Sequence, residues 1–479
     1  MEARVAALES LVNSLTTQLS DSRRLSHAGE DFGRSAFGTD FMGYELDTGN
    51  TAWVLASTAL VLFMTMPGLG LYYCGMVRVE NVLTTVMQTL SITCLITVCW
   101  LAFGYSLSFG PANVNMHGNP YYGDSSRIWL QGMRYDSVHQ LATTIPEPIF
   151  CVYQLTFAII TSALICGSFA DRMKYWPMML FMFLWHWIVY CPIAHWNWHP
   201  NGWLFKLGAI DFAGGNVVHI ASGMAGLASV IIVGNRRGFL KKEFKPHNIL
   251  LTFIGTGMLW VGWFGFNGGS ALAADGRASN AILVTHICAS TAALSWSIFE
   301  CIWKRQATPT VLGMLSGAVS GLVIATPGSG FIDQTGAFVL GLLGGPFCFL
   351  GSQLKHYMGF DDALDAFGVH AIGGMFGGIG VAFFANNVVY HAYKGVYYAG
   401  LEVGGKQLAY QIAGILATGG WSFFASIVIL VTIDKTIGLR VSAEDEDGGL
   451  DKSIHGETIV NVEGDKTVEM TTTTVAIEK

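Results

Sequence analysis

Charged residues are scarce in this chain. Asp, Glu, Lys and Arg make up 12% of its 479 residues, whereas a soluble domain carries about 25%. Apolar residues account for 52%, and the mean hydropathy is +0.46. This composition excludes an ordinary soluble protein and predicts one that crosses a membrane several times.

Sequence motifs of several other protein classes are also absent. The nine Cys residues lack ligand spacing, which argues against a zinc site and a disulfide framework. There is no Walker A sequence for ATP-driven pumping and no TVGYG filter of a potassium channel. No Ser–His–Asp or zinc-hydrolase pattern is present, so we expect neither an enzyme nor a bound metal or cofactor.

Long apolar runs are what the chain has instead. A helix needs about 20 apolar residues to cross a bilayer, and the chain has eleven such runs. We therefore predict an all-α polytopic membrane protein with eleven transmembrane helices. The predicted spans are Thr51–Tyr73, Val82–Leu107, Pro148–Ala170, Trp176–Ala194, Phe212–Val233, Ile249–Phe266, Ala281–Trp303, Val311–Ala325, Ala337–Leu354, Ala366–Phe384 and Gln407–Thr432.

Polar segments flank this membrane domain, which we place at residues 50–433. Residues 1–49 hold no apolar targeting core, so no cleavable signal peptide is visible. Five apolar residues there follow heptad spacing: Val5, Leu8, Val12, Leu15 and Leu19. A lone amphipathic helix, a disordered tail and a short coiled coil all remain open. Residues 434–479 form a polar tail.

The basic residues predict the orientation in the membrane. One set of loops and helix ends holds thirteen Lys and Arg residues and the opposite set holds six. Since cytoplasmic loops are richer in Lys and Arg, the N-terminus is expected outside and the C-terminus in the cytoplasm. We expect a multi-pass protein of the plasma membrane.

One pattern occurs twice. Asp211–Gly226 (DFAGGNVVHIASGMAG) and Asp362–Gly377 (DALDAFGVHAIGGMFG) share Asp at −8, Gly at +4, Met at +5 and Gly at +7 from a central His. The two histidines, His219 and His370, are 151 residues apart (370 − 219). Ten helices then divide into a 5+5 inverted repeat with one extra helix. Such repeats are typical of transporters with their site at the repeat interface.

Each repeated residue has two interpretations. A His inside a membrane helix is either a core residue bonded to backbone or part of a polar path, and the repeat favours a path where both rings face each other. Asp211 either caps the helix that follows or stabilises an incoming cation, and the first interpretation is favoured. Asp362 is expected to be a cap.

Aromatic residues cluster at the predicted outer face. The set is Tyr153, Phe157, Trp196, Trp198, Trp203, Trp263 and Phe266. Most suit an interfacial belt and core packing, but a subset lining a vestibule would attract a small cation by about 2 kcal/mol. Since a bare cation in hydrocarbon costs on the order of tens of kcal/mol, only a neutral species should pass such a dry aromatic pore.

The motifs resemble those of the ammonium transporter family (Amt/Mep, within the Amt/Rh superfamily) from Asn50 to about Glu457. They are ALVLFMTMPGLGLYY from Ala59, PIAHWNW from Pro192, DFAGGNVVHI from Asp211, FKPHN from Phe244, GWFGFNGGSA from Gly262, FGVHAIGG from Phe367, and GLRV with HGE in the tail. The resemblance implies a homotrimer with one pore per subunit that takes ammonium or ammonia, with methylammonium as an analogue.

The resemblance also implies residue roles. Trp198, Ser270, Phe157, Tyr153 and Asp211 match the ammonium-recruiting site, with Tyr153 standing where many members have Phe. Phe157 and Phe266 match the two gating rings, His219 and His370 match the twin His of the pore, and Trp263 matches a lumen aromatic. The tail matches a cytoplasmic regulatory segment, and Ser453 stands where plant members are phosphorylated. An ammonium sensor and a Rh-like neutral gas channel remain alternatives.

Overall fold

The structure is a computed structural model in which residues 45–111, 118–390 and 395–459 are described. The chain divides into two units, residues 1–45 and 46–479, and the description below concerns the second. The predicted heptad segment lies outside the described residues.

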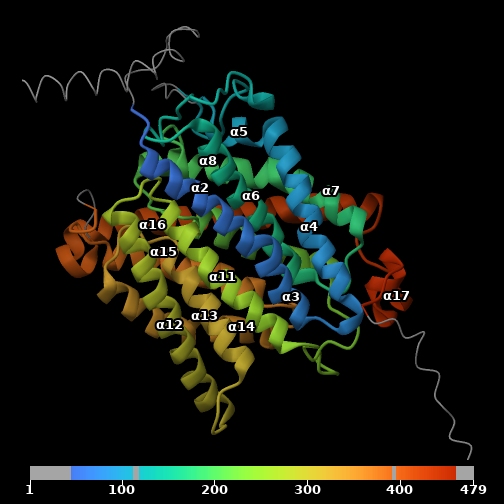
Figure 1. Ribbon diagram of the computed structural model, residues 1–479. Coiled ribbons are helices and arrows are strands. Elements are labelled where there is room, and N and C mark those ends of the chain that lie inside the picture. The colour runs from blue at the N-terminus through green and yellow to red at the C-terminus, as the bar shows by residue number, and fades with distance from the viewer. Residues whose placement is uncertain (1–44, 112–117, 391–394, 460–479) are drawn as a thin grey trace, which may run out of the picture. The chain divides into compact units, whose positions relative to one another are not determined.

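The second unit is helical, and no strand occurs in its described residues beyond three isolated bridges. Figure 1 labels most of the helices along the chain. The α-helices are α2 (Thr48–Phe63), α3 (Gly70–Met76), α4 (Val82–Cys99), α5 (Tyr105–Phe109), α6 (Glu147–Phe169), α7 (Tyr175–Trp185), α8 (Cys191–Trp198), α9 (Trp203–Leu207), α10 (Ala221–Val233), α11 (Ile249–Gly269), α12 (Gly276–Lys304), α13 (Val311–Ala325), α14 (Gln334–Met358), α15 (Ile372–Phe384), α16 (Val396–Thr436) and α17 (Ala443–Gly448). The π-helical turns are η1 (Met64–Leu69), η3 (Trp100–Gly104), η5 (His186–Tyr190), η6 (Gly215–Ile220), η7 (Phe367–Ala371) and η8 (Asp451–His455), and the 3₁₀ turns are η2 (Val79–Asn81) and η4 (Ile128–Leu130).

Within the described ranges, ten helices are long and apolar enough to cross a membrane. They are Thr48–Met76, Val79–Phe109, Glu147–Phe169, Tyr175–Leu207, Gly215–Val233, Ile249–Gly269, Gly276–Lys304, Gln334–Met358, Phe367–Phe384 and Val403–Thr436. The eleventh predicted span is the apolar helix α13, which has only 15 residues. At 1.5 Å per residue it is about 22 Å long, shorter than the hydrocarbon core of a bilayer, about 30 Å.

Side chains that begin the helices explain several of their boundaries. Asp47, Asn248, Asp275, Thr310 and Asp333 each accept a hydrogen bond from a backbone N–H in the first turn that follows. Such N-caps satisfy amide groups that the helix itself cannot pair. They therefore fix where α2, α11, α12, α13 and α14 start.

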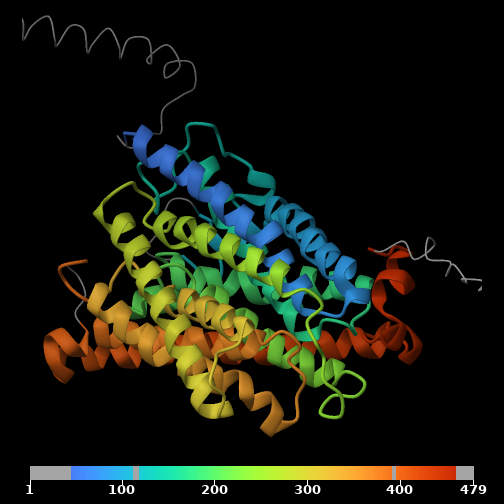
Figure 2. The same ribbon diagram turned by 60° about the horizontal axis from the view of Figure 1, so that its bottom comes forward.

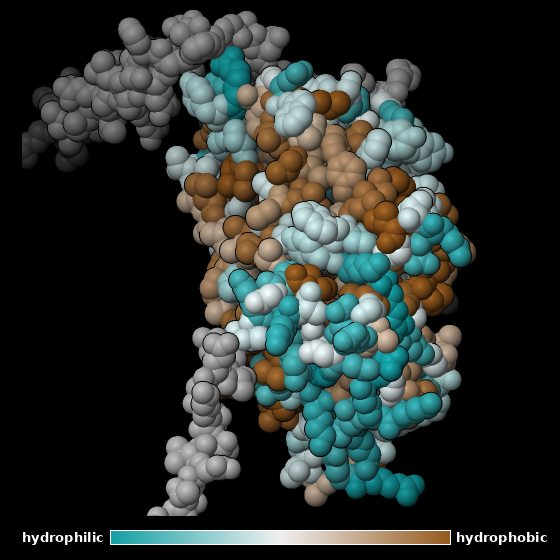
Figure 3. Space-filling view, turned by 90° about the vertical axis from the view of Figure 1, so that its right-hand side faces the viewer, coloured by the Kyte–Doolittle hydropathy of each residue, from teal (hydrophilic) through white to brown (hydrophobic). Residues whose placement is uncertain are grey.

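The surface is apolar where a bilayer would surround it. Large apolar side chains are exposed along α12, among them Leu283, Leu294, Ile298 and Ile302. By contrast, α6 is buried along almost its whole length. The side on which α7 and α17 lie in Figure 1 shows an apolar upper part and a polar lower part (Figure 3). This distribution is that of a multi-pass membrane protein.

The helices α10 and α15 continue from the two repeated segments, and the long helix α16 packs against both. In Figure 2, α16 is the long orange to red helix in the lower part of the view. Its Gln411 donates hydrogen bonds to the carbonyls of Ile210 and Gly378, and its Ser422 donates one to the carbonyl of Ala221. Helix α16 therefore holds the two repeated segments together by polar contacts.

Candidate functional site

The structure places the two repeat-matched histidines in contact. The Nδ1 atoms of His219 and His370 lie 3.2 Å apart, and their rings are nearly parallel at 17° with centroids 5.3 Å apart. The side chains are 0% and 4% exposed. The two halves of the chain thus contribute one imidazole each to a single buried polar pair.

The Nδ1–Nδ1 contact determines how both rings are protonated. A neutral imidazole has one N–H, so one Nδ1 donates and the other accepts. The donor ring is then left with a bare Nε2, and the acceptor ring carries its proton on Nε2. The Nε2 of His219 is buried without a hydrogen-bond partner in the described protein. The pair can therefore offer one acceptor and one donor to a small polar molecule.

Both histidines lie in π-helical turns, η6 and η7. In η6 the backbone N–H of His219 donates to the carbonyl of Gly214, five residues earlier. Such turns are rare and occur often at functional sites.

The glycines four residues after each His explain how closely the two His-bearing segments approach each other. A Cβ on Gly223 would lie 2.4 Å from the backbone N of Ala371, and one on Gly374 would lie 3.1 Å from Cβ of His219.

Trp263 covers one face of the histidine pair. Its ring stacks on His219 at 14° with centroids 5.4 Å apart. Its indole N–H donates to Oγ1 of Thr326 at 2.9 Å, and Thr326 donates in turn to the carbonyl of Leu322. This anchored ring fixes the orientation of the His219 imidazole.

The two phenylalanines lie next to the pair. The rings of Phe157 on α6 and Phe266 on α11 stack at 29° with centroids 4.3 Å apart. Phe266 lies 6.1 Å from His219, and both phenylalanines are almost completely buried. A continuous series of rings therefore leads from Phe157 to His370.

A small cavity of ≈ 120 Å³ lies on the other side of Phe157. It brings together three of the predicted recruiting residues, Trp198, Phe157 and Ser270. The Trp198 ring meets the Phe157 ring edge-on at 5.6 Å. The other lining residues are Phe109, Leu141, Phe150, Gln154, Phe212 and Leu272.

Tyr153 and Asp211 lie behind this cavity rather than on its wall. The Tyr153 hydroxyl lies 2.9 Å from the carbonyl oxygens of Gly265 and Phe266 and 3.3 Å from Oγ of Ser270. The Asp211 carboxylate accepts from four backbone N–H groups, those of Gly214 to Val217. These four hydrogen bonds support the interpretation of Asp211 as the cap of the helix that follows it.

Gln154 is a cavity residue that the sequence analysis did not identify. It lines the cavity, and its Oε1 is buried without a hydrogen-bond partner in the described protein. Its position three residues before Phe157 puts both on one face of α6. A single amide in an otherwise apolar run is the signal that would have found it.

The C-terminal tail is packed on the membrane domain as far as it is described. The Asp451 carboxylate accepts from the backbone N–H groups of Leu83 and Thr84 at the start of α4. Arg440 forms an ion pair with Glu446 at 2.8 Å. Ser453 lies in η8, is exposed, and donates to the carbonyl of Gly449 at 3.0 Å. Residues 460–479 lie outside the described residues.

In the described residues, ten apolar spans around a buried series of aromatic and imidazole rings define a polytopic membrane transport protein. No cluster of three His, Cys, Asp or Glu side chains that could hold a metal occurs in the parts of the chain that the structure describes. Residues 52–460 match the model of the Ammonium Transporter Family. The chain belongs to this family, so it is a transporter of ammonium and not an enzyme.

Proteins of similar sequence and structure support this assignment to the family. The chain is 42% identical to the "Ammonium transporter" of Bacillus subtilis, covering 86% of this chain and 98% of that protein. It is 41% identical to "Ammonium transporter 1" of Schizosaccharomyces pombe, covering 86% and 82%. The crystal structure of Saccharomyces cerevisiae Mep2 aligns with a TM-score of 0.76 at 33% identity, covering 84% of this chain and 92% of that chain. A "Sensor Amt Protein" aligns with the same TM-score at 26% identity, covering 85% and 98%.

Proposed function

We propose that the chain gathers ammonium at the ≈ 120 Å³ cavity, where the cation releases its proton to water at the mouth, and passes ammonia between Phe157 and Phe266 and along the histidine pair. The series of stacked, buried rings carries this proposal. Trp198 and Phe157 attract the cation by about 2 kcal/mol, and Ser270 and Gln154 supply hydrogen-bonding atoms. Since a bare cation in such a dry slot costs on the order of tens of kcal/mol, the neutral form passes.

The histidine pair then replaces the hydrogen bonds that ammonia loses on leaving water. Ammonia both donates and accepts, and the pair offers one bare Nε2 and one Nε2–H. Asp211, with four backbone amides bound, maintains the helix start that places His219. Of the recruiting role predicted for Asp211, the part that we retain is the attraction of the incoming cation by its negative charge.

His219→Ala tests the pathway. We expect methylammonium uptake into proteoliposomes and the ammonium-evoked current to fall at least tenfold together, because ammonia loses one of its two imidazoles. Thr432→Ala, at an exposed position of α16, is the control and should transport normally. Unchanged uptake and selectivity in His219→Ala would remove the histidine pair from the mechanism.

The same recordings decide between the alternatives. A current on adding ammonium favours an electrogenic transporter, and uptake without current favours a Rh-like neutral gas channel. The likeness to a solved "Sensor Amt Protein" keeps a sensor role as a second candidate. In that case the pore would bind ammonium while the tail passes on the signal to a cytoplasmic regulator.

We also propose the finer architecture of the membrane domain. The shared contacts at the two matched π-turns support a 5+5 inverted repeat plus α16, with α13 as a short eleventh membrane helix. The distribution of Lys and Arg supports an outer N-terminus and a cytoplasmic C-terminus in the plasma membrane. The orientation can be tested by measuring which Lys and Arg side chains react with impermeant reagents applied to each side of the membrane in turn.

A homotrimer is proposed from the outer face of α12. His286 is exposed in the middle of this 29-residue helix and accepts a hydrogen bond from the Trp260 indole N–H at 3.2 Å. An ionisable side chain at that depth is costly in lipid, so this face is covered by a second copy of the chain. Disulfide cross-linking through His286→Cys should give covalent dimers, while native mass spectrometry of the assembly should give the mass of three chains.

Phosphorylation of Ser453 is proposed as a switch for the tail. The residue is exposed, and Asp451 two residues earlier already holds two amides of α4. A phosphate beside this carboxylate would repel it and release the tail. Ser453→Asp should change uptake, and an uptake equal to that of the unmodified protein would contradict the switch.

A further inference from the structure

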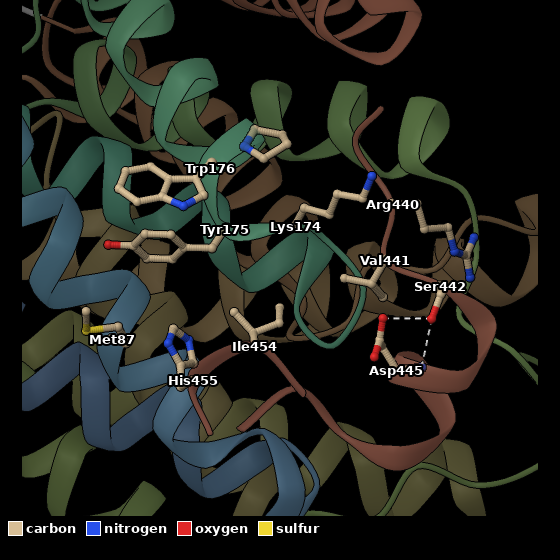
Figure 4. Close-up of a pocket in the computed structure, with 11 residues that line it drawn as sticks. Met87, Lys174, Tyr175, Trp176, Arg440, Val441, Ser442, Asp445, Ile454 and His455 are labelled. Atoms are coloured by element: carbon tan, nitrogen blue, oxygen red, sulfur yellow. Dashed lines mark hydrogen bonds between the residues drawn. The ribbon is translucent and has the colours of Figure 1, made fainter. Parts of the chain in front are cut away.

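A second and larger cavity lies between the membrane domain and the tail. Its volume is ≈ 740 Å³, and its walls come from α4, the start of α7 and both ends of the tail (Figure 4). The lining residues are Met87, Lys174, Tyr175, Trp176, Pro177, Arg440, Val441, Ser442, Asp445, Ile454 and His455. None of them belongs to the pathway proposed for ammonium.

One end of the cavity is charged. Lys174 extends toward Arg440 in Figure 4, and its ammonium group has no hydrogen-bond or ion-pair partner in the described structure. Arg440 is paired with Glu446, and the Asp445 carboxylate, which accepts from the Ser442 hydroxyl at 2.7 Å, is the anionic group among the lining residues. Lys174 therefore gives this end an available positive charge.

The other end is aromatic and apolar. Trp176 is 74% exposed, and Tyr175 lies edge-on to His455 with centroids 5.7 Å apart. Met87 lies on α4 and is exposed, as are its neighbours Val86 and Leu90 on the same bilayer-facing part of that helix. The apolar end is thus continuous with surface that contacts lipid chains.

We propose that this cavity binds an anionic phospholipid. Its phosphate pairs with Lys174, and its glycerol and first acyl carbons lie against Trp176 and Met87. A Trp and a Lys at the start of a membrane helix are the usual neighbours of lipid headgroups. In the orientation proposed above, the cavity faces the leaflet that is rich in anionic lipid.

The bound lipid would also hold the tail in place. The tail strand pairs with the loop before α7 through two backbone bonds, from Lys174 N–H to the Leu439 carbonyl and from Val441 N–H to the Arg172 carbonyl. His455, from the far end of the tail, lines the aromatic end of the cavity beside Tyr175. A lipid in the cavity therefore bridges both ends of the tail and α7.

Native mass spectrometry of the full chain tests this binding, with phosphatidylglycerol and phosphatidylcholine titrated separately. One Lys near a membrane surface contributes about 1 kcal/mol, which is about fivefold in affinity. We expect Lys174→Gln to bind phosphatidylglycerol about fivefold more weakly and Lys174→Arg to bind it normally. Lys452→Gln removes an exposed tail charge outside the cavity and is the matched control.

Two results would overturn the proposal. One is equal phosphatidylglycerol affinity in Lys174→Gln and the unmodified protein. The other is displacement of the lipid by soluble glycerol phosphate at equal concentration, which would make the ligand a free phosphate anion. If Lys174→Gln does not fold, Trp176→Ala replaces it, because this exposed side chain is removed without opening the core. Methylammonium uptake measured in parallel separates failure of this site from failure of the transport proposal.

Discussion

Asp211 and Asp362 occupy matched places in the repeat but differ in their bonding. Asp211 accepts four backbone N–H groups, two on each carboxylate oxygen. Asp362 accepts one, from Phe367, on Oδ2, while its Oδ1 has no hydrogen-bond partner in the described protein. Hydrogen bonds to a charged group contribute about 1.5–3 kcal/mol each. The same residue therefore stabilises the first repeat more than the second.

Asp211→Asn should consequently destabilise the protein much more than Asp362→Asn. The amide retains one acceptor oxygen, so Asp211 loses two of four bonds and their charge, about 3 kcal/mol. Asp362→Asn should cost about 1 kcal/mol. Thermal unfolding in detergent measures both. Equal unfolding temperatures for the two variants would show that the amide contacts of Asp211 do not stabilise the fold.

The sequence indicated which residues gather at the site better than it indicated how they are held. The spacing around His219 and His370 is enough to single out both rings from the sequence. Tyr153 was expected on the wall of the mouth, yet it lies behind it because its hydroxyl bonds the end of α11. Gln154 was missed because a pattern of residue types does not show which buried atoms lack partners.

At the scale of elements, the crossing of the two His-bearing helices depends on small residues. Gly223 lies four residues after His219, and a side chain there would meet the backbone of η7. Gly374 is its match in the second repeat. The glycines of the repeated pattern are therefore explained by contact between backbones.

Gly223→Ala should separate the histidines without unfolding the protein. A Cβ 2.4 Å from the Ala371 nitrogen forces η6 and η7 apart, so we expect methylammonium uptake to fall at least tenfold. The control is Gly420→Ala in α16, where nothing lies within 4 Å of the new Cβ. That variant should transport normally. Normal uptake by Gly223→Ala would show that the site tolerates a wider crossing.

The helices themselves were predictable because the bilayer requires long apolar runs, and their boundaries were less so. The span predicted from Phe212 begins as a helix only at Gly215, since Asp211 accepts from the amides of Gly214 to Val217 at that start. The π-turns η6 and η7 were not foreseen, because an extra residue in a turn leaves hydropathy unchanged. Contacts between distant segments decide such details.

At the scale of the whole molecule, buried ion pairs connect the loops on the side where the tail docks. The Asp361 carboxylate accepts from Nε and Nη2 of Arg236, both at 2.8 Å. Arg236 also contacts Asp171, which accepts from Asn81, and Asn81 accepts from the backbone N–H of Leu450 in the tail. One network therefore joins the loops that hold Asp171, Arg236 and Asp361 to the tail.

This network should weaken in acid. Burial alone would raise the pKa of Asp361, but the hydrogen bonds and charge of Arg236 reverse this and lower the pKa overall. A lowered pKa stabilises the fold above the unfolded value, about 3.9, and this stability is lost as the pH falls through the folded value. We expect unfolding temperatures to drop below about pH 4.

Asp361→Asn provides the comparison for that experiment. It should be destabilised by about 3 kcal/mol at pH 7, because Arg236 keeps its buried charge, and should show a smaller further drop in acid. Glu444→Gln changes an exposed tail carboxylate and should follow the unmodified protein. An equal acid response in all three proteins would place the sensitivity elsewhere.

Two like imidazoles that share a single proton have two arrangements, which differ only in the ring that holds it. Moving that proton across the 3.2 Å contact, with one proton gained at Nε2 of the donor ring and one lost from Nε2 of the acceptor ring, exchanges the roles of His219 and His370. The series of rings therefore does not by itself favour transport in one direction. Net flow in either direction would follow the concentration and electrical gradients across the membrane, and any preference for import must come from the ends of the path.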